Sequence, residues 1–154
     1  MVTTHKISAE LYDDSFKLIA VHCNLSSYAM AYNINKAAQL QLKRALFDLD
    51  LETLSFPVYE WQDDMSDTNW TLVSNAAKNI EKSPSIGLFS ENSAERTHYL
   101  IDERKEVDYF LKIETDDETI LNTIVLGVKS IPKVITAYSI DLEVLKSKRN
   151  LIFL

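Results

Sequence analysis

Glycine, proline and cysteine are scarce in this chain of 154 residues, which contains 2 glycines, 3 prolines and 1 cysteine. A loop that binds nucleotide phosphates needs several closely spaced glycines, because only glycine lets backbone N–H groups crowd around a phosphate. Gly87 and Gly127 lie far apart in the sequence, which excludes a P-loop and a dinucleotide-binding fingerprint. The single cysteine, Cys23, cannot form an intramolecular disulfide, so the fold depends on packing.

Long apolar runs and an excess of positive charge are also lacking. No stretch approaches the roughly eighteen consecutive apolar residues of a membrane-spanning helix. Residues 1–15 have no basic start followed by an apolar block, so we expect no export signal and a cytoplasmic location. The net charge of −7 argues against affinity gained by neutralising phosphates. We therefore expect neither nucleic acid nor a membrane as partner, and we interpret the basic cluster at 145–149 as a solvated chain end.

The composition, with 46% hydrophobic and 25% charged residues, is typical of a globular protein. A chain of this length can bury a substantial core without metals or disulfides. No repeat, low-complexity tract or linker-like segment interrupts it. We therefore predict one domain over residues 1–154.

Patterns of apolar and polar residues predict alternating strands and helices. Residues 16–23 predict a strand, followed by a helix that Ser26 or Ser27 caps. Residues 39–51 alternate in two phases, which indicates a long half-buried strand with a bulge near Lys43 and Arg44. Further strands are expected at 56–61, 70–75, 85–89, 97–101, 133–141 and 150–154.

The clearest helix is expected to begin at Thr115, whose spacing from Glu118 is that of a capping box. An apolar stripe follows at helical spacing and ends before Pro132. The stripe consists of Ile120, Leu121, Ile124, Val125, Val128 and Ile131.

The order of these elements predicts an α+β fold, with a mainly antiparallel sheet and helices on one face. The segment 107–141 is similar in pattern to half of a ferredoxin-like or ACT-type module. Such a likeness concerns architecture alone, because one fold serves many functions.

Two short patterns fit known motifs but are expected to be chance matches. Asp63, Asp64 and Asp67 have the D-D-x-x-D spacing with which isoprenoid synthases bind magnesium and diphosphate, yet they lie in a polar loop after a strand. Ser130 and Lys133 fit S-x-x-K, yet the companion motifs are missing. Neither pattern predicts an active site.

No metal or cofactor site is expected. The three histidines are scattered, and none has a partner at the helical spacing of a zinc site. His22 and Cys23 are adjacent and point to opposite faces of a strand, so we expect one in the core and the other in solvent. Cys23 is expected to be an inert, buried thiol.

Residues 101–113, IDERKEVDYFLKI, begin with a run of charged residues and continue with a stretch in which the side chains are expected to alternate between two faces of a strand. We predict a single helical turn or a tight bend over 102–106 and a strand from Val107 onward. Val107 and Tyr109 would share the buried face, with the Tyr109 hydroxyl bonded to a partner. Asp108 and Phe110 would lie on the wetter face.

This segment resembles the motif that gives the IPExxxVDY family of small bacterial proteins its name. The matching residues are Ile101, Glu103, Val107, Asp108 and Tyr109. Residues 16–35 and 145–153 also resemble the beginning and end of that family, whereas Asp102 stands where the motif has proline. The resemblance implies a cytoplasmic bacterial protein, and it supplies no catalytic residues because the family has no established activity.

Glu103 and Asp108 have two interpretations. They are either structural residues at a junction between a turn and a strand, or they flank a pocket with Tyr109 as an acid/base or ligand-binding pair. Catalysis would require one carboxyl to be desolvated and within reach of a substrate. We favour the structural interpretation.

Three hypotheses about function remain. The first is a non-enzymatic binding or adaptor protein that docks a protein partner, or a second copy of itself, through an exposed sheet edge or an apolar surface. The second is an ACT-like domain that senses a small molecule. The third is an enzyme that uses carboxylates around residues 101–109.

Overall fold

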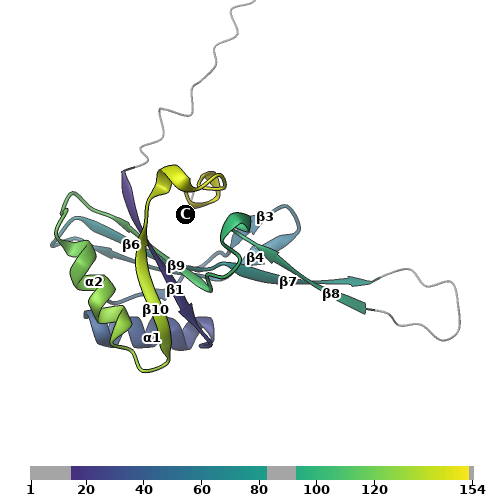
Figure 1. The fold of residues 1–154 in the computed structure, drawn as a ribbon, viewed down its shortest axis with the longest axis horizontal. Coiled ribbons are helices and arrows are strands. Elements are labelled where there is room, and N and C mark those ends of the chain that lie inside the picture. Colours follow the sequence, from purple (N-terminus) through teal and green to yellow (C-terminus); the bar gives the residue numbers. More distant parts are fainter. Residues whose placement is uncertain (1–14, 83–92, 153–154) are drawn as a thin grey trace, which may run out of the picture.

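The computed structural model describes residues 15–82 and 93–152, and Figure 1 shows the chain as a ribbon. Within these residues, six strands form the main sheet in the spatial order β10-β1-β9-β6-β5-β2, and neighbours are antiparallel. The strands are β1 (Phe16–Cys23), β2 (Lys43–Arg44), β5 (Val58–Asp63), β6 (Thr68–Ser74), β9 (Tyr109–Glu114) and β10 (Val134–Ile140). The two edges of the sheet are therefore β10 and the short strand β2.

The central strand β1 is buried on both faces. Ile19 and Val21 belong to the core on one side of the sheet, whereas Leu18 and Ala20 belong to the core on the other side. A strand buried on both faces has a near-continuous apolar sequence instead of a strict alternation. The sequence FKLIAVHC has this property.

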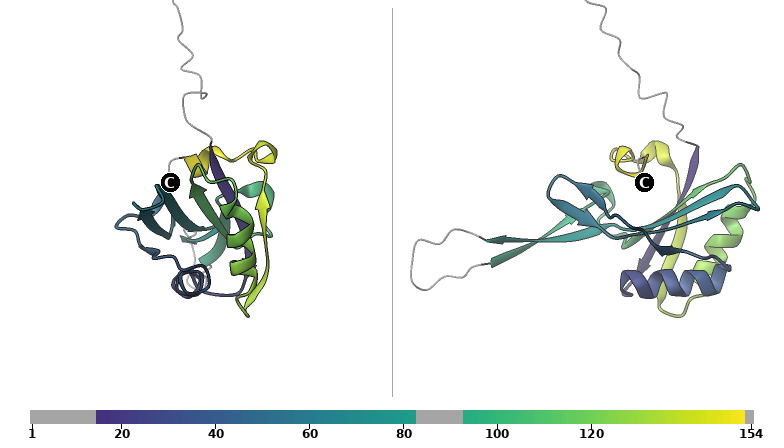
Figure 2. Two further views of the ribbon diagram at one scale, coloured as in Figure 1. Left: turned by 90° about the vertical axis from the view of Figure 1, so that its left-hand side faces the viewer. Right: turned by 180° about the vertical axis from the view of Figure 1, so that it is seen from behind.

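Two helices, α1 (Ser27–Ala38) and α2 (Ile120–Lys129), cover one face of the sheet (Figures 1 and 2). They approach each other closely at Gly127 of α2, where a Cβ atom would lie 3.4 Å from the Ala37 carbonyl oxygen. The apolar stripe of α2 points into this core, with Ile124 and Val128 buried. Helix α2 is thus anchored on the sheet and on α1.

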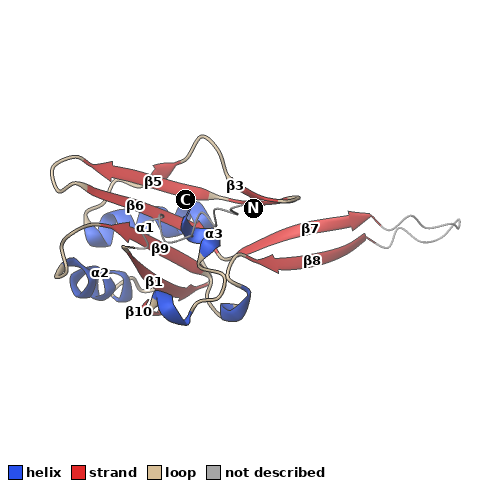
Figure 3. Cartoon of the chain, turned by 90° about the horizontal axis from the view of Figure 1, so that it is seen from above, coloured by secondary structure: helices blue, strands red, loops and turns tan. Residues whose placement is uncertain are grey.

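The opposite face of the sheet carries a second core. It is covered by β3 (Leu49–Leu51), β4 (Leu54–Phe56), the short helical turns η2 (Asp102–Arg104) and η3 (Leu142–Val144), and α3 (Arg149–Ile152). Figure 2 shows the C-terminal turns on the side of the sheet away from α1. The ribbon of β7 (Ala76–Lys82) and β8 (Ser93–Tyr99) extends away from the sheet (Figures 1 and 3).

The structure confirms the α+β class and the mainly antiparallel sheet. It also confirms the strands at 16–23 and 133–141 and the helical turn after Ile101, within one or two residues. The ferredoxin-like or ACT-type likeness stays a prediction. Among the described residues, no helix is long and apolar enough to cross a membrane. The strand expected at 85–89 lies outside the described residues.

The long strand expected at 39–51 is wrong. The chain instead leaves α1 through Gln39, which has a left-handed backbone with φ 56°, and then forms β2 and β3 in two different sheets. Leu40 and Leu42 are buried against α1, which explains their alternation without a continuous strand. The apolar alternation therefore has two separate causes. Leu40 and Leu42 pack in the core with α1, whereas Leu49 and Leu51 pack against the second core.

Two further predictions in the C-terminal part of the chain are wrong: the start of the helix expected at Thr115 and the strand expected at 150–154. Helix α2 begins at Ile120 because Thr115 and Asp117 accept backbone hydrogen bonds within tight turns, so no capping box forms. Residues 149–152 form α3 in place of the first part of the strand expected at 150–154, whose last two residues lie outside the described residues, and the Asn150 amide donates to the Leu100 carbonyl. Polar side chains that bond the nearby backbone decide these boundaries.

Three expectations about exposure and facing are corrected. The face of β9 that carries Phe110 and Lys112 is not the wetter one, because both residues are buried under the second core. Val107 belongs to that second core and does not share a face with Tyr109. Residues 145–149 are not merely a solvated end, since Leu145 is buried.

The close approach of α1 to Gly127 limits the size of the side chain that position 127 can hold. A Gly127→Ala substitution should raise the free energy of unfolding by up to about 1 kcal/mol, because the added methyl meets ordinary contacts and alanine has the higher helix propensity. Gly127→Leu should destabilise by about 1–3 kcal/mol through overpacking. Urea unfolding measures both, with Thr123→Leu on the exposed face of α2 as the control. An unchanged Gly127→Leu would contradict this packing.

Candidate functional site

The segment 100–108, called here the junction, is held by the buried side chain of Asn75. The Asn75 amide nitrogen donates to the carbonyls of Arg104 (2.8 Å) and Val107 (2.9 Å), and its oxygen accepts from the Ile101 N–H (2.8 Å). The Asn75 N–H also donates to the Asp108 carbonyl. One side chain thus replaces the backbone partners that a regular strand or helix would supply.

Glu103 binds the C-terminal part of the chain. Its carboxylate accepts hydrogen bonds from the Ser147 N–H and hydroxyl, both at 2.7 Å. Partial desolvation of this carboxyl works against ionisation, but the hydrogen bonds from Ser147 together outweigh it and hold the pKa of Glu103 below its ordinary value. Glu103 therefore has a structural role that accounts for its charge.

Asp108 and Tyr109 secure the region where β1 leads into α1. The Asp108 carboxylate accepts from the Cys23 N–H at 2.9 Å, and the Tyr109 hydroxyl donates to the Leu25 carbonyl at 2.6 Å. The expectation that Tyr109 is buried with a bonded hydroxyl is confirmed. Burial raises the pKa of Tyr109.

The structure does not bring Glu103 and Asp108 together through a shared partner. Glu103 binds Ser147, whereas Asp108 binds the backbone of Cys23 at the end of β1. Burial raises the pKa of the Cys23 thiol, which opposes formation of a thiolate nucleophile. His22 is half-buried and Cys23 is buried, in keeping with their opposite orientation.

The two motif matches have local structural roles. The Asp63 carboxylate accepts from the Ser66 hydroxyl within the turn between β5 and β6, and Asp67 there has a φ of 48°. The Ser130 hydroxyl donates to the Gly127 carbonyl at the end of α2. In the part of the chain that the structure describes, no cluster of three or more histidine, cysteine, aspartate or glutamate side chains could hold a metal ion.

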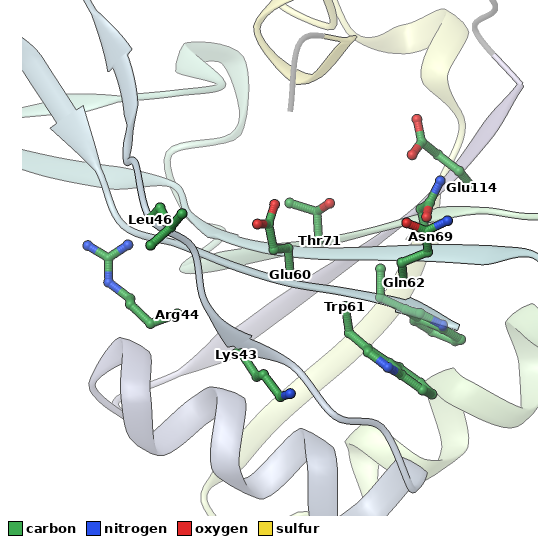
Figure 4. A pocket seen from close by; sticks show the side chains of 10 residues that line it. Lys43, Arg44, Leu46, Glu60, Trp61, Gln62, Asn69, Thr71 and Glu114 are labelled. Atoms are coloured by element: carbon green, nitrogen blue, oxygen red, sulfur yellow. The ribbon is translucent and has the colours of Figure 1, made fainter. Parts of the chain in front are cut away.

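A polar hollow of about 580 Å³ lies at the β2 end of the sheet. Residues that line it include Leu46, Glu60, Gln62, Asn69, Thr71 and Glu114. Figure 4 shows Glu60 and Thr71 on one side of the strands and Trp61 on the other. Strand pairing places Glu60 opposite Thr71 and Gln62 opposite Asn69. The polar side chains of the hollow thus lie on the face opposite α1 and α2, whereas Trp61 and Trp70, which also line it, pack in the core beneath these helices.

Lys112 lies beside this polar hollow with only 1% of its surface exposed. Its ammonium group is 3.0 Å from the Glu114 carboxylate and 4.8 Å from the centre of the Phe16 ring. Strand pairing also places it opposite Thr71, which is 7% exposed. A buried lysine requires such compensation, and here a carboxylate and an aromatic ring provide it.

Two adjacent apolar side chains project from the loop at residues 45–48, called here the Leu46–Phe47 loop. Leu46 is 93% exposed and Phe47 is 84% exposed. The loop is braced at both ends, because the Ala45 N–H donates to the Val58 carbonyl and Arg44 forms an ion pair with Asp48.

Further hydrogen bonds hold the far side of this loop. The Ser55 hydroxyl lies within hydrogen-bond distance of the carboxylates of Asp48 (3.1 Å) and Asp50 (2.7 Å). The structure therefore presents Leu46 and Phe47 to solvent on a loop that is tied to the sheet edge.

Sequence reasoning missed Asn75, Leu46 and Phe47. Asn75 was included in a strand candidate, although asparagine is depleted in strands, and this depletion was the available signal. Leu46 was also out of phase with the apolar alternation of residues 45–51. An apolar residue on the expected polar face could have indicated an exposed site.

No protein-family model matches this sequence, and neither a curated protein nor a solved structure matches it significantly.

Removal of the Asn75 side chain should destabilise the protein strongly. Asn75→Ala leaves the Ile101 N–H and the Val107 carbonyl without partners, while the Arg104 carbonyl keeps only the Val107 N–H, which should lower the free energy of unfolding by at least about 2 kcal/mol. Asn69→Ala is the matched control, because its exposed side chain should change stability by less than about 0.5 kcal/mol. Equal melting temperatures for the two variants would contradict this role.

The Glu103→Gln substitution should show that the Glu103 carboxylate contributes to the free energy of unfolding in a pH-dependent way. Because the folded-state pKa of Glu103 is lowered, its contribution is present above the ordinary glutamate pKa and is lost as pH falls through the lowered value. The variant should be less stable than wild type at pH 7 by under about 1 kcal/mol, since the group is exposed. Urea unfolding across the acid range should show this gap closing.

The control for this experiment is Glu60→Gln, because the Glu60 carboxylate has no hydrogen bond within residues 15–82 and 93–152. Asp108→Asn can be measured alongside it. A specific loss of activity or binding in Glu103→Gln or Asp108→Asn, with unchanged unfolding at every pH, would instead support the pocket interpretation.

Proposed function

We propose that this protein is a non-enzymatic binding or adaptor protein, and that a protein partner docks at the β2 edge of the sheet. The observation that carries the proposal is the near-complete exposure of Leu46 and Phe47 on a braced loop. Large apolar side chains that gather on a surface indicate an interaction site. The partner would offer an apolar pocket that receives these two side chains.

The energetics favour Leu46 and Phe47 as anchors. Burial of one leucine or phenylalanine side chain contributes about 1.5–3 kcal/mol. Because hydrogen bonds and an ion pair already order the loop, little conformational entropy remains to be lost on binding. The adjoining polar hollow supplies amide, hydroxyl and carboxylate groups for the polar rim that surrounds such anchors.

The sensing of a small molecule has weaker support. The polar hollow could receive a polar ligand, and Thr71 in its wall is 7% exposed. However, Glu60, Gln62 and Asn69 are all exposed, as is common for the solvated face of an antiparallel sheet. The protein-binding hypothesis explains the exposed apolar pair, whereas the sensor hypothesis does not.

An enzyme built on the junction has the least support. The Glu103 and Asp108 carboxylates already accept hydrogen bonds from Ser147 and Cys23. A general acid or base must instead reach a proton of the substrate. The resemblance to the IPExxxVDY family and the cytoplasmic location stay predictions.

The test is quantitative affinity purification from the native cell with three versions of the full chain. Leu46→Ser/Phe47→Ser should reduce recovery of the partner at least about tenfold, because two anchors that each contribute more than about 1 kcal/mol are lost. The melting temperature should not fall, since both side chains are exposed.

Met65→Ser is the matched control. Met65 is 99% exposed but lies in the turn after β5, whereas the Leu46–Phe47 loop lies beside the beginning of β5. It should recover the same partner as wild type. Equal recovery by the double variant, or equal loss in both variants, would rule out the Leu46–Phe47 loop as the docking site.

A further inference from the structure

The polar hollow beside the Leu46–Phe47 loop contains four side chains that make no hydrogen bond in the described part of the chain. They are Glu60, Gln62, Asn69 and Thr71. Strand pairing arranges them in two rows on one face of the sheet, with Glu60 opposite Thr71 and Gln62 opposite Asn69. The hollow is therefore lined by donors and acceptors that the fold itself does not use.

Thr71 is the member of this set that is buried. Only 7% of its surface is exposed, yet its hydroxyl has no hydrogen bond within residues 15–82 and 93–152. Figure 4 shows its side chain on the same side of the strands as Glu60. Buried polar groups in proteins are nearly always hydrogen-bonded, because a buried group without a partner is costly. The Thr71 hydroxyl is thus available to a molecule that enters the hollow.

Glu60 gives the hollow a negative charge without a partner. Its carboxylate forms no ion pair among the described residues. Lys43 lies opposite Glu60 in the strand register, but Figure 4 shows the two side chains on different sides of the strands. Arg44 forms its ion pair with Asp48. Neither of the two cations that line the hollow therefore pairs with Glu60.

The buried ammonium group of Lys112 is also directed elsewhere. It lies 3.0 Å from the Glu114 carboxylate and 4.8 Å from the centre of the Phe16 ring. Lys112 is opposite Thr71, and Thr71 is opposite Glu60, so two strand spacings of about 4.8 Å each separate the backbones of Lys112 and Glu60. The charge of Glu114 is thus matched, and Glu60 is the carboxylate that a bound cation would complete.

We propose that the protein partner at the Leu46–Phe47 loop inserts an arginine side chain into the polar hollow, where its guanidinium group binds the Glu60 carboxylate and the Thr71 hydroxyl. A guanidinium group has five N–H donors in a planar fork and no acceptor, so it fits a carboxylate beside a second oxygen. The amide oxygens of Gln62 and Asn69 can accept the remaining donors. This inference rests on the proposed function, because it describes the same docking event.

The position of the hollow and the local charge both favour a basic side chain of the partner as the occupant. Leu46 itself lines the hollow, so one partner can reach the apolar anchors and the polar groups together. The segment 43–60, which contains the loop, has two basic residues and four acidic ones, namely Asp48, Asp50, Glu52 and Glu60. Complementary charge steers the encounter of two proteins and selects between partners.

NMR titration of the full chain with acetyl-arginine amide tests the arginine subsite without the partner. The amide should bind with a millimolar dissociation constant, because one partly exposed ion pair is weak, and it should shift the backbone signals of residues 60–62 and 69–71. Acetyl-citrulline amide has nearly the same shape but no charge, and acetyl-glutamate amide has the opposite charge. Both should leave these signals unchanged.

Three variants identify the groups that bind the amide. Glu60→Gln and Thr71→Val should each weaken its binding at least about fivefold, since each removes one of the two main contacts. Glu143→Gln should bind the amide as wild type does, because Glu143 is exposed after β10, at the opposite edge of the sheet. Thr71→Val should not lower the melting temperature, since the hydroxyl that it removes has no partner in the free protein.

Several outcomes would overturn the arginine subsite. They are equal shifts with the citrulline amide, no shift at high millimolar concentration of the arginine amide, and a lowered melting temperature of Thr71→Val, which would show that its hydroxyl is already bonded. A micromolar dissociation constant for the arginine amide would instead assign the hollow to a free cationic molecule and overturn the partner's side chain as its source.

Affinity purification separates this inference from the proposed function. Glu60→Gln and Thr71→Val should reduce recovery of the partner that the Leu46→Ser/Phe47→Ser variant loses. If only the Leu46→Ser/Phe47→Ser variant loses the partner, the docking site stands and the arginine subsite is overturned. The Leu46→Ser/Phe47→Ser variant should still bind the arginine amide, because Glu60 and Thr71 remain. If it binds the amide and also recovers the partner as wild type does, the docking site fails.

Discussion

The buried amide of Asn75 is the interaction on which much of the second core depends. The junction has no strand partner of its own, and yet Ile101 and Val107 on either side of its exposed turn are buried. Asn75 supplies donors and an acceptor to this backbone, and only then can Ile101 and Val107 pack into the core. A buried peptide group without such a partner would be expensive. The conformation of the junction follows from that constraint.

The charged residues of the junction add contacts between segments that are distant in sequence. Arg104 donates to the Tyr138 hydroxyl on β10 at 2.7 Å, and Glu103 binds Ser147 beyond it. The charges that suggested chemistry at residues 101–109 thus connect the junction to the last strand and the C-terminal turns. The two edges of the sheet, β10 and β2, lie apart from these contacts and differ in length and charge.

Much of the fold could be predicted from the sequence where periodicity was strong. The strands at 16–23 and 133–141 and the stripe of α2 are long enough for burial to impose a clear pattern. Residues 39–51 show the limit, because Leu40 and Leu42 are buried by α1 whereas the neighbouring Leu46 is exposed. Asn75 and Leu46 each break the local pattern, but the sequence could not show what they contact, since that depends on distant segments.

The sequence by itself determined the α+β class, the antiparallel sheet, the burial of Tyr109 and the inert environment of Cys23, because local periodicity and side-chain chemistry govern these properties. Only the tertiary structure decided that Glu103 and Asp108 have separate partners and that β10 and β2 are the edges. It also decided which apolar residues stay in solvent. Strand order and long-range hydrogen bonds depend on which distant segments contact each other, and local sequence patterns do not specify those contacts.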